Sequence, residues 1–370
     1  MHKAKKESTH LPLFILGGVV LYFLSGMVDE LRVYQGATIA VYVIAISSII
    51  LLTGYSGQVS LGHGALMAVG AYAAAVLRIE FNLPIILCFV AAVLAAAIGG
   101  ALLGAAAVLR IEFNLPIILC FVASVLAAAI GGALLGAAAA RLSGPYLAGT
   151  TLALAIGLPS LANQFEVLGG EQGLLFDVGF PPLSLGEEFT QYKWFFWIAA
   201  LAALISMWVI RNLLNSAYGR AWRAGRGNEV AAQLAGINTA RSKVLAFTIS
   251  AGIAGLAGAL LAMTIGTVSP SAFPLALSFS LLTGAVLSGI TTLGGVIIGA
   301  VVLVAIPEIA DVVAHRLGSS ESVTTNLPGL IVSGLLILTV LFVPNGPVEQ
   351  HRARKAKHAA RHTSSKKDKH

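Results

Sequence analysis

The chain has 370 residues, of which 57% are hydrophobic and 11% charged, whereas a soluble domain carries about a quarter charged residues. The net charge is +7, and the basic residues gather at Lys3–Lys6, Arg211–Lys243 and Arg352–Lys369. This composition excludes a water-soluble enzyme or binding module, and the continuous apolar runs exclude the alternating strands of an outer-membrane barrel.

Apolar segments long enough to cross about 30 Å of hydrocarbon follow one another along the chain. We predict membrane segments at 11–28, 36–54, 59–77, 84–107, 115–139, 145–163, 193–211, 243–268, 276–306 (a paired segment) and 328–343. The predicted fold is an all-α integral membrane protein, a polytopic helical bundle of about 8–10 transmembrane segments with interrupted helices. We expect residues 1–345 to form one transmembrane domain and 346–370 to form a basic, disordered tail.

Charge placement predicts the orientation of the bundle. Basic loops tend to stay in the cytoplasm, so we place Lys3–Lys6, the loop 216–242 and the tail on that side. The loop 164–192 contains five acidic residues and no lysine or arginine, which predicts an external position.

A tandem repeat lies early in the chain. Residues 76–107 recur as 108–139 with one change, Ala92 to Ser124, and Cys88 and Cys120 occupy equivalent positions as packed thiols. If the N-terminus is cytoplasmic and only one copy crosses, six crossings bring the loop 216–242 to the cytoplasmic side. If both copies cross, seven crossings place that loop outside. We therefore expect one copy to lie as a surface or half-inserted element; the alternative is an N-terminus that faces outward.

The passage 54–65, GYSGQVSLGHGA, is polar and rich in glycine between two apolar runs. Interrupted membrane helices usually line a cavity, because freed backbone groups are costly against lipid. Gln58, Ser60 and His63 could then offer hydrogen bonds to a passing solute. A polar seam between helices, without contact to the solute, remains an open alternative.

The loop 216–242 is too charged to span the membrane. Residues 229–234 favour a short helix that Gly236 can close as a C-cap. Such a helix suits a groove on a partner protein, although on chemistry alone a solvated connector is the preferred interpretation.

The segment 276–306 has a glycine-rich centre, SGITTLGG at 288–295. Two arms of about a dozen residues are each too short to cross, which predicts a re-entrant hairpin rather than one kinked span. The sequence has no G-x-x-x-x-G-K-[ST] motif, so ATP, if it is used, must bind to another subunit.

Four stretches resemble the branched-chain amino acid ABC-importer permeases, and specifically the second permease subunit of that system. They are GYSGQVSLGHGALMAVGAY (54–72), LGGEQGL (168–174), the stretch from YGRAWRAGRGNEVAAQLAGIN to AGLAGAL (218–260), and SGITTLGGVIIGA (288–300). The resemblance implies a multi-pass protein of the bacterial or archaeal cytoplasmic (inner) membrane. Its implied partners are a second permease, two cytoplasmic ATPases and an extracytoplasmic solute-binding protein.

The same resemblance assigns the loop 216–242 to ATPase coupling and reverses the preference for a connector. The residues that match the family's docking loop are Glu229, Ala231, Ala232 and Gly236. The predicted coupling residues of the loop also include Gly219, Arg220, Arg223 and Arg226. The extra 32-residue block and the long basic tail depart from the family pattern.

The predicted function is import of leucine, isoleucine and valine, with no catalytic residue, metal or cofactor in this chain and no nucleic-acid partner. A permease for urea or short amides is the alternative within the same class. An ATP-independent channel or transporter and a membrane-embedded enzyme are alternatives from other classes.

Overall fold

The computed structural model describes residues 28–81, 145–165, 168–175 and 189–316 continuously, and a few single residues outside these ranges. The predicted spans at 11–28 and 328–343, the basic tail and most of the duplicated block therefore lie outside the continuously described residues.

The described ranges form a bundle of apolar helices. The long helices are α2 (Glu30–Ile49), α3 (His63–Phe81), α7 (Pro145–Ala162), α8 (Gln191–Asn215), α11 (Thr239–Ile265), α12 (Leu275–Ser288) and α13 (Val296–Arg316). Five segments in this part of the chain are long and apolar enough to cross a membrane: Glu30–Tyr55, Gln191–Asn215, Thr239–Ile265, Pro270–Ser288 and Leu293–Ala310. The predicted all-helical membrane fold is confirmed.

Short elements complete the described ranges. They are the π-helix η2 (Ile50–Tyr55), helices α9 (Ala217–Gly227) and α10 (Glu229–Leu234), the 3-10 turns η7 (Pro270–Ala272) and η8 (Leu293–Gly295), and strands β1 (Leu174–Leu175) and β2 (Thr267–Val268). The two strands pair antiparallel, with Leu174 opposite Val268 and Leu175 opposite Thr267. This ladder joins the loop that was predicted to be external to the link that follows α11.

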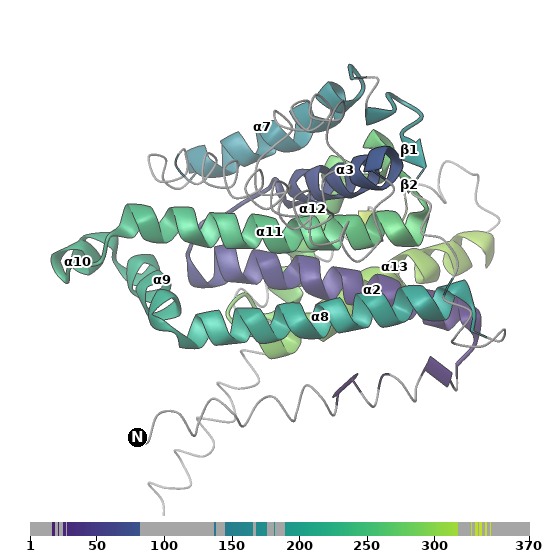
Figure 1. Ribbon diagram of the computed structural model, residues 1–370. Helices are drawn as coiled ribbons and strands as arrows, with labels where there is room; N and C mark the ends of the chain where they lie inside the picture. The colour runs from purple at the N-terminus through teal and green to yellow at the C-terminus, as the bar shows by residue number, and fades with distance from the viewer. Residues whose placement is uncertain are drawn as a thin grey trace, which may run out of the picture.

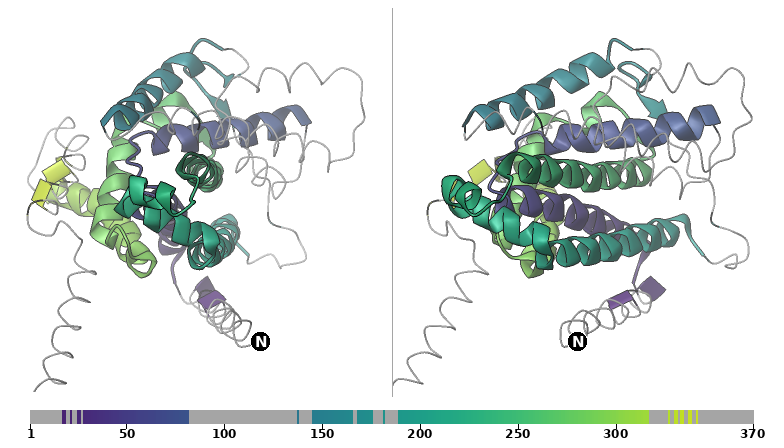
Figure 2. Two further views of the ribbon diagram at one scale, coloured as in Figure 1. Left: turned by 90° about the vertical axis from the view of Figure 1, so that its left-hand side faces the viewer. Right: turned by 60° about the vertical axis from the view of Figure 1, so that its left-hand side comes forward.

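Helices α3, α11, α2 and α8 lie side by side, and α7 runs beside α3 (Figure 1). Helices α9 and α10 lie at one end of this bundle, and strands β1 and β2 lie at the other (Figures 1 and 2). We call these the α9–α10 end and the β1–β2 end. Helices α2 and α8 run toward the α9–α10 end, whereas α3, α7 and α11 run away from it.

Aromatic side chains gather where α2 and α8 begin, away from α9 and α10. The rings of Tyr34 and Tyr192 meet edge to face with centroids 5.8 Å apart, and those of Phe189 and Trp197 with centroids 5.0 Å apart. Tyrosine and tryptophan are enriched where a membrane meets water, so this cluster is placed as an interfacial belt would be.

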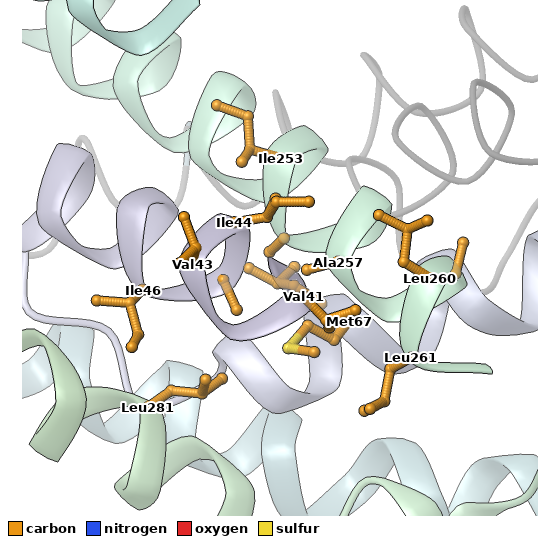
Figure 3. Packing of buried hydrophobic residues seen from close by; sticks show 14 of the residues in the cluster. Val41, Val43, Ile44, Ile46, Met67, Ile253, Ala257, Leu260, Leu261 and Leu281 are labelled. Atoms are coloured by element: carbon orange, nitrogen blue, oxygen red, sulfur yellow. The ribbon is translucent and has the colours of Figure 1, made fainter. Parts of the chain in front are cut away.

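The core forms where α11 crosses α2 and α3 (Figure 3). Val41 and Ile44 of α2, Met67 of α3 and Ala257 and Leu260 of α11 are buried there. A Cβ added at Gly258 would collide with the backbone of Met67, so the absence of a side chain lets α3 and α11 come into backbone contact. Lipid gives no hydrophobic drive for helix association, so close approach of this kind holds membrane helices together.

The hairpin at 276–306 differs from its prediction in the length of its arms. The turn lies where expected, but α12 has 14 residues and α13 has 21. At about 1.5 Å per residue α13 is roughly 31 Å long, enough to cross the hydrocarbon layer. The prediction ended the second arm before Pro307, whereas the helix continues through it to Arg316; proline is tolerated in membrane helices because neighbouring groups satisfy the freed backbone.

Candidate functional site

Helix α10 is a rigid projection at the α9–α10 end. Asn228 caps its start, with the side-chain oxygen accepting from the Ala231 amide at 3.0 Å. At its end the Ile237 amide donates to the Ala232 carbonyl and the Gly236 amide to that of Gln233. This pair of bonds requires a left-handed residue, and Gly236 has φ of 83°. The predicted helix at 229–234 and its glycine closure are confirmed.

The outward face of α10 is apolar. Val230 is 65% exposed and Leu234 is 86% exposed, and the four-residue spacing puts both on one side of the helix. Ala232, which faces the bundle, is only 4% exposed. Two large apolar side chains exposed on one face of a folded helix form a candidate docking surface.

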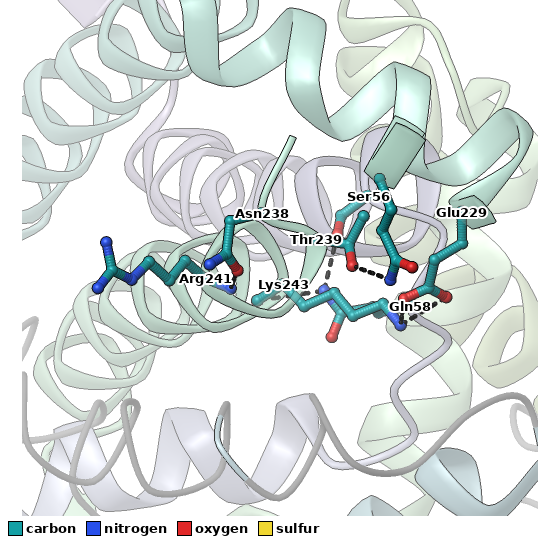
Figure 4. A network of polar contacts seen from close by, with 8 residues as sticks. Ser56, Gln58, Glu229, Asn238, Thr239, Arg241 and Lys243 are labelled. Carbon is teal, nitrogen blue, oxygen red and sulfur yellow. Dashed lines mark hydrogen bonds and ion pairs between the residues drawn. The ribbon is translucent and has the colours of Figure 1, made fainter. Parts of the chain in front are cut away.

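An ion pair holds α10 against α11 (Figure 4). The Lys243 ammonium lies 2.7 and 2.8 Å from the two carboxylate oxygens of Glu229. The hydrogen bond from Lys243 holds the pKa of the Glu229 carboxyl below its ordinary value. Gln233 adds a bond of 2.8 Å to the hydroxyl of Thr239.

Helix α9 is anchored by Trp222 and Gly219. Trp222 is 2% exposed, and its indole Nε1 donates to the Ser242 carbonyl at 2.9 Å. A Cβ at Gly219 would collide with the backbone of Leu214, so glycine permits the corner between α8 and α9. These contacts leave α9 and α10 fixed to the bundle.

The three arginines of α9 face different surroundings. Arg226 donates from its guanidinium to the Gly54 carbonyl at the end of η2. Arg223 lies over the ring of Tyr55, 6.0 Å from its centroid. Arg220 is exposed and reaches the Asn215 carbonyl at 3.4 Å.

The interruption predicted at 54–65 is present, since η2 ends at Tyr55 and α3 begins at His63. Gln58, Ser60 and His63 are 4%, 2% and 1% exposed, so in this conformation they lie inside the bundle. Gln58 donates to the Ser56 hydroxyl at 2.7 Å and to the Lys243 carbonyl at 3.2 Å.

The polar groups of this passage bind neighbouring helices. His63 Nε2 lies 3.1 Å from the Ser250 hydroxyl of α11, which in turn donates to the Ser48 carbonyl of α2 at 2.8 Å. The Gly64 amide donates to Ser278 of α12 at 2.9 Å. Gln58 Oε1 and His63 Nδ1 have no hydrogen-bond partner among the described residues. The arrangement is that of a polar seam with two unused hydrogen-bonding atoms.

A separate cavity of about 350 Å³ lies between α2 and α8. Its lining is largely apolar and includes Val33, Ala40 and Val43 of α2 and Phe196, Ala203 and Met207 of α8. It does not include Gln58, Ser60 or His63, so it is distinct from the predicted pathway residues.

Val230, Leu234 and Lys243 were not among the residues singled out in the sequence. The spacing of Val230 and Leu234 indicates a shared face, but spacing alone does not say whether that face points inward or outward. The pairing of Lys243 with Glu229 depends on the turn after α10, which folds α11 back beside it.

Comparisons with known proteins agree with this geometry. A family model described as "Branched-chain amino acid transport system / permease component" matches residues 35–114 and 105–341. The two matched segments overlap inside the duplicated block, where an additional copy would interrupt the family pattern.

Individual relatives show the same likeness. The high-affinity branched-chain amino acid transport system permease protein LivM of Escherichia coli K12 is 30% identical over 328 residues, covering 83% of this chain and 67% of LivM. LivM of Salmonella typhimurium gives the same figures. The LivH permease of Escherichia coli K12 is 30% identical over 201 residues, 54% of this chain and 58% of LivH. No solved structure matches the chain significantly.

Proposed function

This chain belongs to the family of permease components of branched-chain amino acid transport systems, and we propose that it carries leucine, isoleucine and valine inward as part of an ATP-driven importer. It is a multi-pass subunit of the inner membrane. A partner pair of cytoplasmic ATPases supplies the energy, a second permease completes the path, and an extracytoplasmic binding protein delivers the solute.

The observation that carries the proposal is the exposed face of α10. Val230 and Leu234 project from the α9–α10 end of a bundle whose helices are apolar enough to lie in a membrane. The basic residues of the loop 216–242 favour a cytoplasmic position for this end, so we infer that its partner is a cytoplasmic protein with an apolar groove. An ATPase subunit that receives α10 fits both the position and the chemistry.

The solute path is proposed to pass Gln58, Ser60 and His63. Gln58 and His63 bridge the interrupted segment and α11, and Ser60 accepts from the Gly62 amide within the segment, so all three become accessible when those helices separate. The free Gln58 Oε1 and His63 Nδ1 are then available to a zwitterion of amino-acid size. Neither group requires an ionic ligand, which agrees with a neutral solute.

The docking surface is tested by replacing Val230 and Leu234 together with aspartate. Burying two carboxylates in an apolar groove is strongly unfavourable, so the pair should abolish ATPase co-purification and ATP-driven uptake of labelled leucine. The control is Arg241→Ala, which alters an exposed residue of the same loop outside the predicted coupling set and should leave both unchanged. Normal uptake by the double variant would refute docking through α10.

The substrate is tested by competition in the intact system. Unlabelled isoleucine and valine should suppress uptake of labelled leucine, whereas urea and acetamide should not. Dominant competition by urea would instead support the amide permease, and uptake that persists without the ATPases would support an ATP-independent transporter.

A further inference from the structure

The arginine at the end of α9 makes contacts that a docking residue does not need. The guanidinium of Arg226 bonds the Gly54 carbonyl, one of the last carbonyls of η2. Carbonyls at a helix end lack partners within the helix and carry partial negative charge, so a cation is favourable there. Arg226 is thus directed toward the interrupted helix, away from the exposed face of α10.

The same side chain lies against the turn that follows η2. Gly57 has φ of 75°, and a Cβ added there would lie 2.9 Å from Cγ of Arg226. Arg223 lies over the ring of Tyr55, one turn of α9 earlier. Two successive turns of α9 therefore hold the segment 54–57 from one side.

The segment 54–57 is joined in turn to the hairpin between α12 and α13. The Tyr55 hydroxyl donates to the Thr291 carbonyl at 2.8 Å. Gly54 lies so close to the backbone of Ile290 that a Cβ would collide with its carbonyl oxygen. A displacement of residues 54–57 cannot leave the hairpin turn where it is, because backbone lies on backbone.

A second connection runs beside the first. Gln58 donates to the Lys243 carbonyl, and the Lys243 ammonium pairs with Glu229 of α10 (Figure 4). Both connections lead from helices α9 and α10, at the exposed end of the bundle, to the start of the passage that contains His63. They form a continuous set of contacts from the exposed end of the protein to the buried polar seam.

We propose that Arg226 is a positioning residue that transmits movement of α9 to the interrupted helix and, through Tyr55, to the hairpin turn at 289–292. It acts inside the permease and takes no part in holding the ATPase. This inference rests on the proposed function, since it assigns a role within an ATP-driven cycle.

The test separates docking from transmission in the reconstituted complex. Arg226→Ala should retain ATPase co-purification at the wild-type ratio and retain ATP hydrolysis, because Val230 and Leu234 are untouched. Leucine uptake per ATP hydrolysed should fall about tenfold or more, since a charge-assisted contact is lost. Arg226→Lys keeps the charge without the planar fork and should recover part of the coupling. Arg241→Ala removes an exposed arginine that is not among the predicted coupling residues, so it serves as the matched control and should couple normally.

Tyr55→Phe provides a second variant that leaves α9 intact. It removes the hydroxyl that reaches Thr291 and keeps the ring beneath Arg223, so it should also lower uptake per ATP while ATPase binding stays normal. Wild-type retention of the ATPase reports that α9 and α10 are folded in each variant.

Three results would overturn the inference. They are loss of ATPase binding in proportion to loss of uptake in Arg226→Ala, normal coupling in Arg226→Ala, and normal coupling in Tyr55→Phe. Absence of ATP-driven uptake in the wild-type complex would refute the proposed function itself, and is therefore distinguishable from failure of this inference.

Discussion

The ion pair of Glu229 and Lys243 should make the stability of the protein depend on pH. The pKa of the Glu229 carboxyl is lowered by the hydrogen bond from Lys243, so its contribution to stability is full above the ordinary value of 4.5. This contribution is lost as the pH falls through the lowered pKa of Glu229. Wild-type protein should therefore melt at a slightly higher temperature than Glu229→Gln at pH 7, and this difference should vanish in acid.

The expected difference is small, below about 1 kcal/mol, because the Glu229 side chain is 41% exposed. Lys243→Gln should show the same loss, and the double variant should lose little more than either single variant. Additive effects of the two substitutions would contradict the pairing.

Single residues also show how far a sequence determines a site. The cap at Gly236 follows from local chemistry, since glycine readily adopts the left-handed conformation. The roles of Arg220, Arg223 and Arg226 cannot be separated in this way, because all three are arginines in one loop. Arg220 reaches the nearby Asn215 carbonyl, whereas the partners of Arg223 and Arg226, Tyr55 and Gly54, are set by tertiary packing.

At the scale of elements, the contact between α3 and α11 depends on the absence of side chains. Gly258→Leu should destabilise the protein by about 1–3 kcal/mol or more, because the new side chain would meet the Met67 backbone, which cannot rotate away. The midpoint of thermal unfolding in detergent measures this effect.

Gly225 in α9 is the matched control, since nothing lies within 4 Å of a Cβ placed there. Gly225→Ala should leave stability unchanged or raise it by about 0.5–1 kcal/mol, because alanine is the better helix former. Equal destabilisation by both variants would show that the crossing of α3 and α11 is not the cause.

Helix boundaries were predicted well where composition changes sharply and poorly where it does not. α8 and α11 end at polar or glycine residues, and their predicted spans differ from the observed ones by a few residues. α13 carries apolar residues on both sides of Pro307, so local sequence gives no clear end. The break between η2 and α3 was predictable because several polar and glycine residues occur together.

In the whole molecule, the directions of α3 and α7 limit how many times the duplicated block between them can cross the membrane. α3 ends at the β1–β2 end and α7 begins at the other, as the 3.0 Å bond between the Leu61 amide and Thr151 near the start of α7 indicates. An odd number of crossings between them is therefore required, whichever side the N-terminus occupies. We predict that only one copy of the repeat crosses.

Deleting residues 108–139 tests this prediction. The copies differ at one position, so the deletion leaves one nearly unchanged copy, and leucine uptake should stay near the wild-type level. Removing both predicted spans, at 84–107 and 115–139, should abolish uptake by reversing every later helix. A single-copy variant that inserts but places a cysteine at Ser216 outside the cell would contradict the prediction.

Helix α11 is long and apolar enough to cross the membrane, so in the proposed topology its two ends face different compartments. Its 27 residues, roughly 40 Å long, run from the cap at Asn238 beside α10 to the strand pair formed by β2. Binding events at the two ends of such a helix affect each other reciprocally. If the proposed binding protein outside and ATP bound to the proposed ATPases favour the same position of α11, each must tighten binding of the other by the same factor. The effect of the binding protein on ATP affinity and the effect of ATP on binding-protein affinity are then one coupling constant, measurable from either side of the membrane.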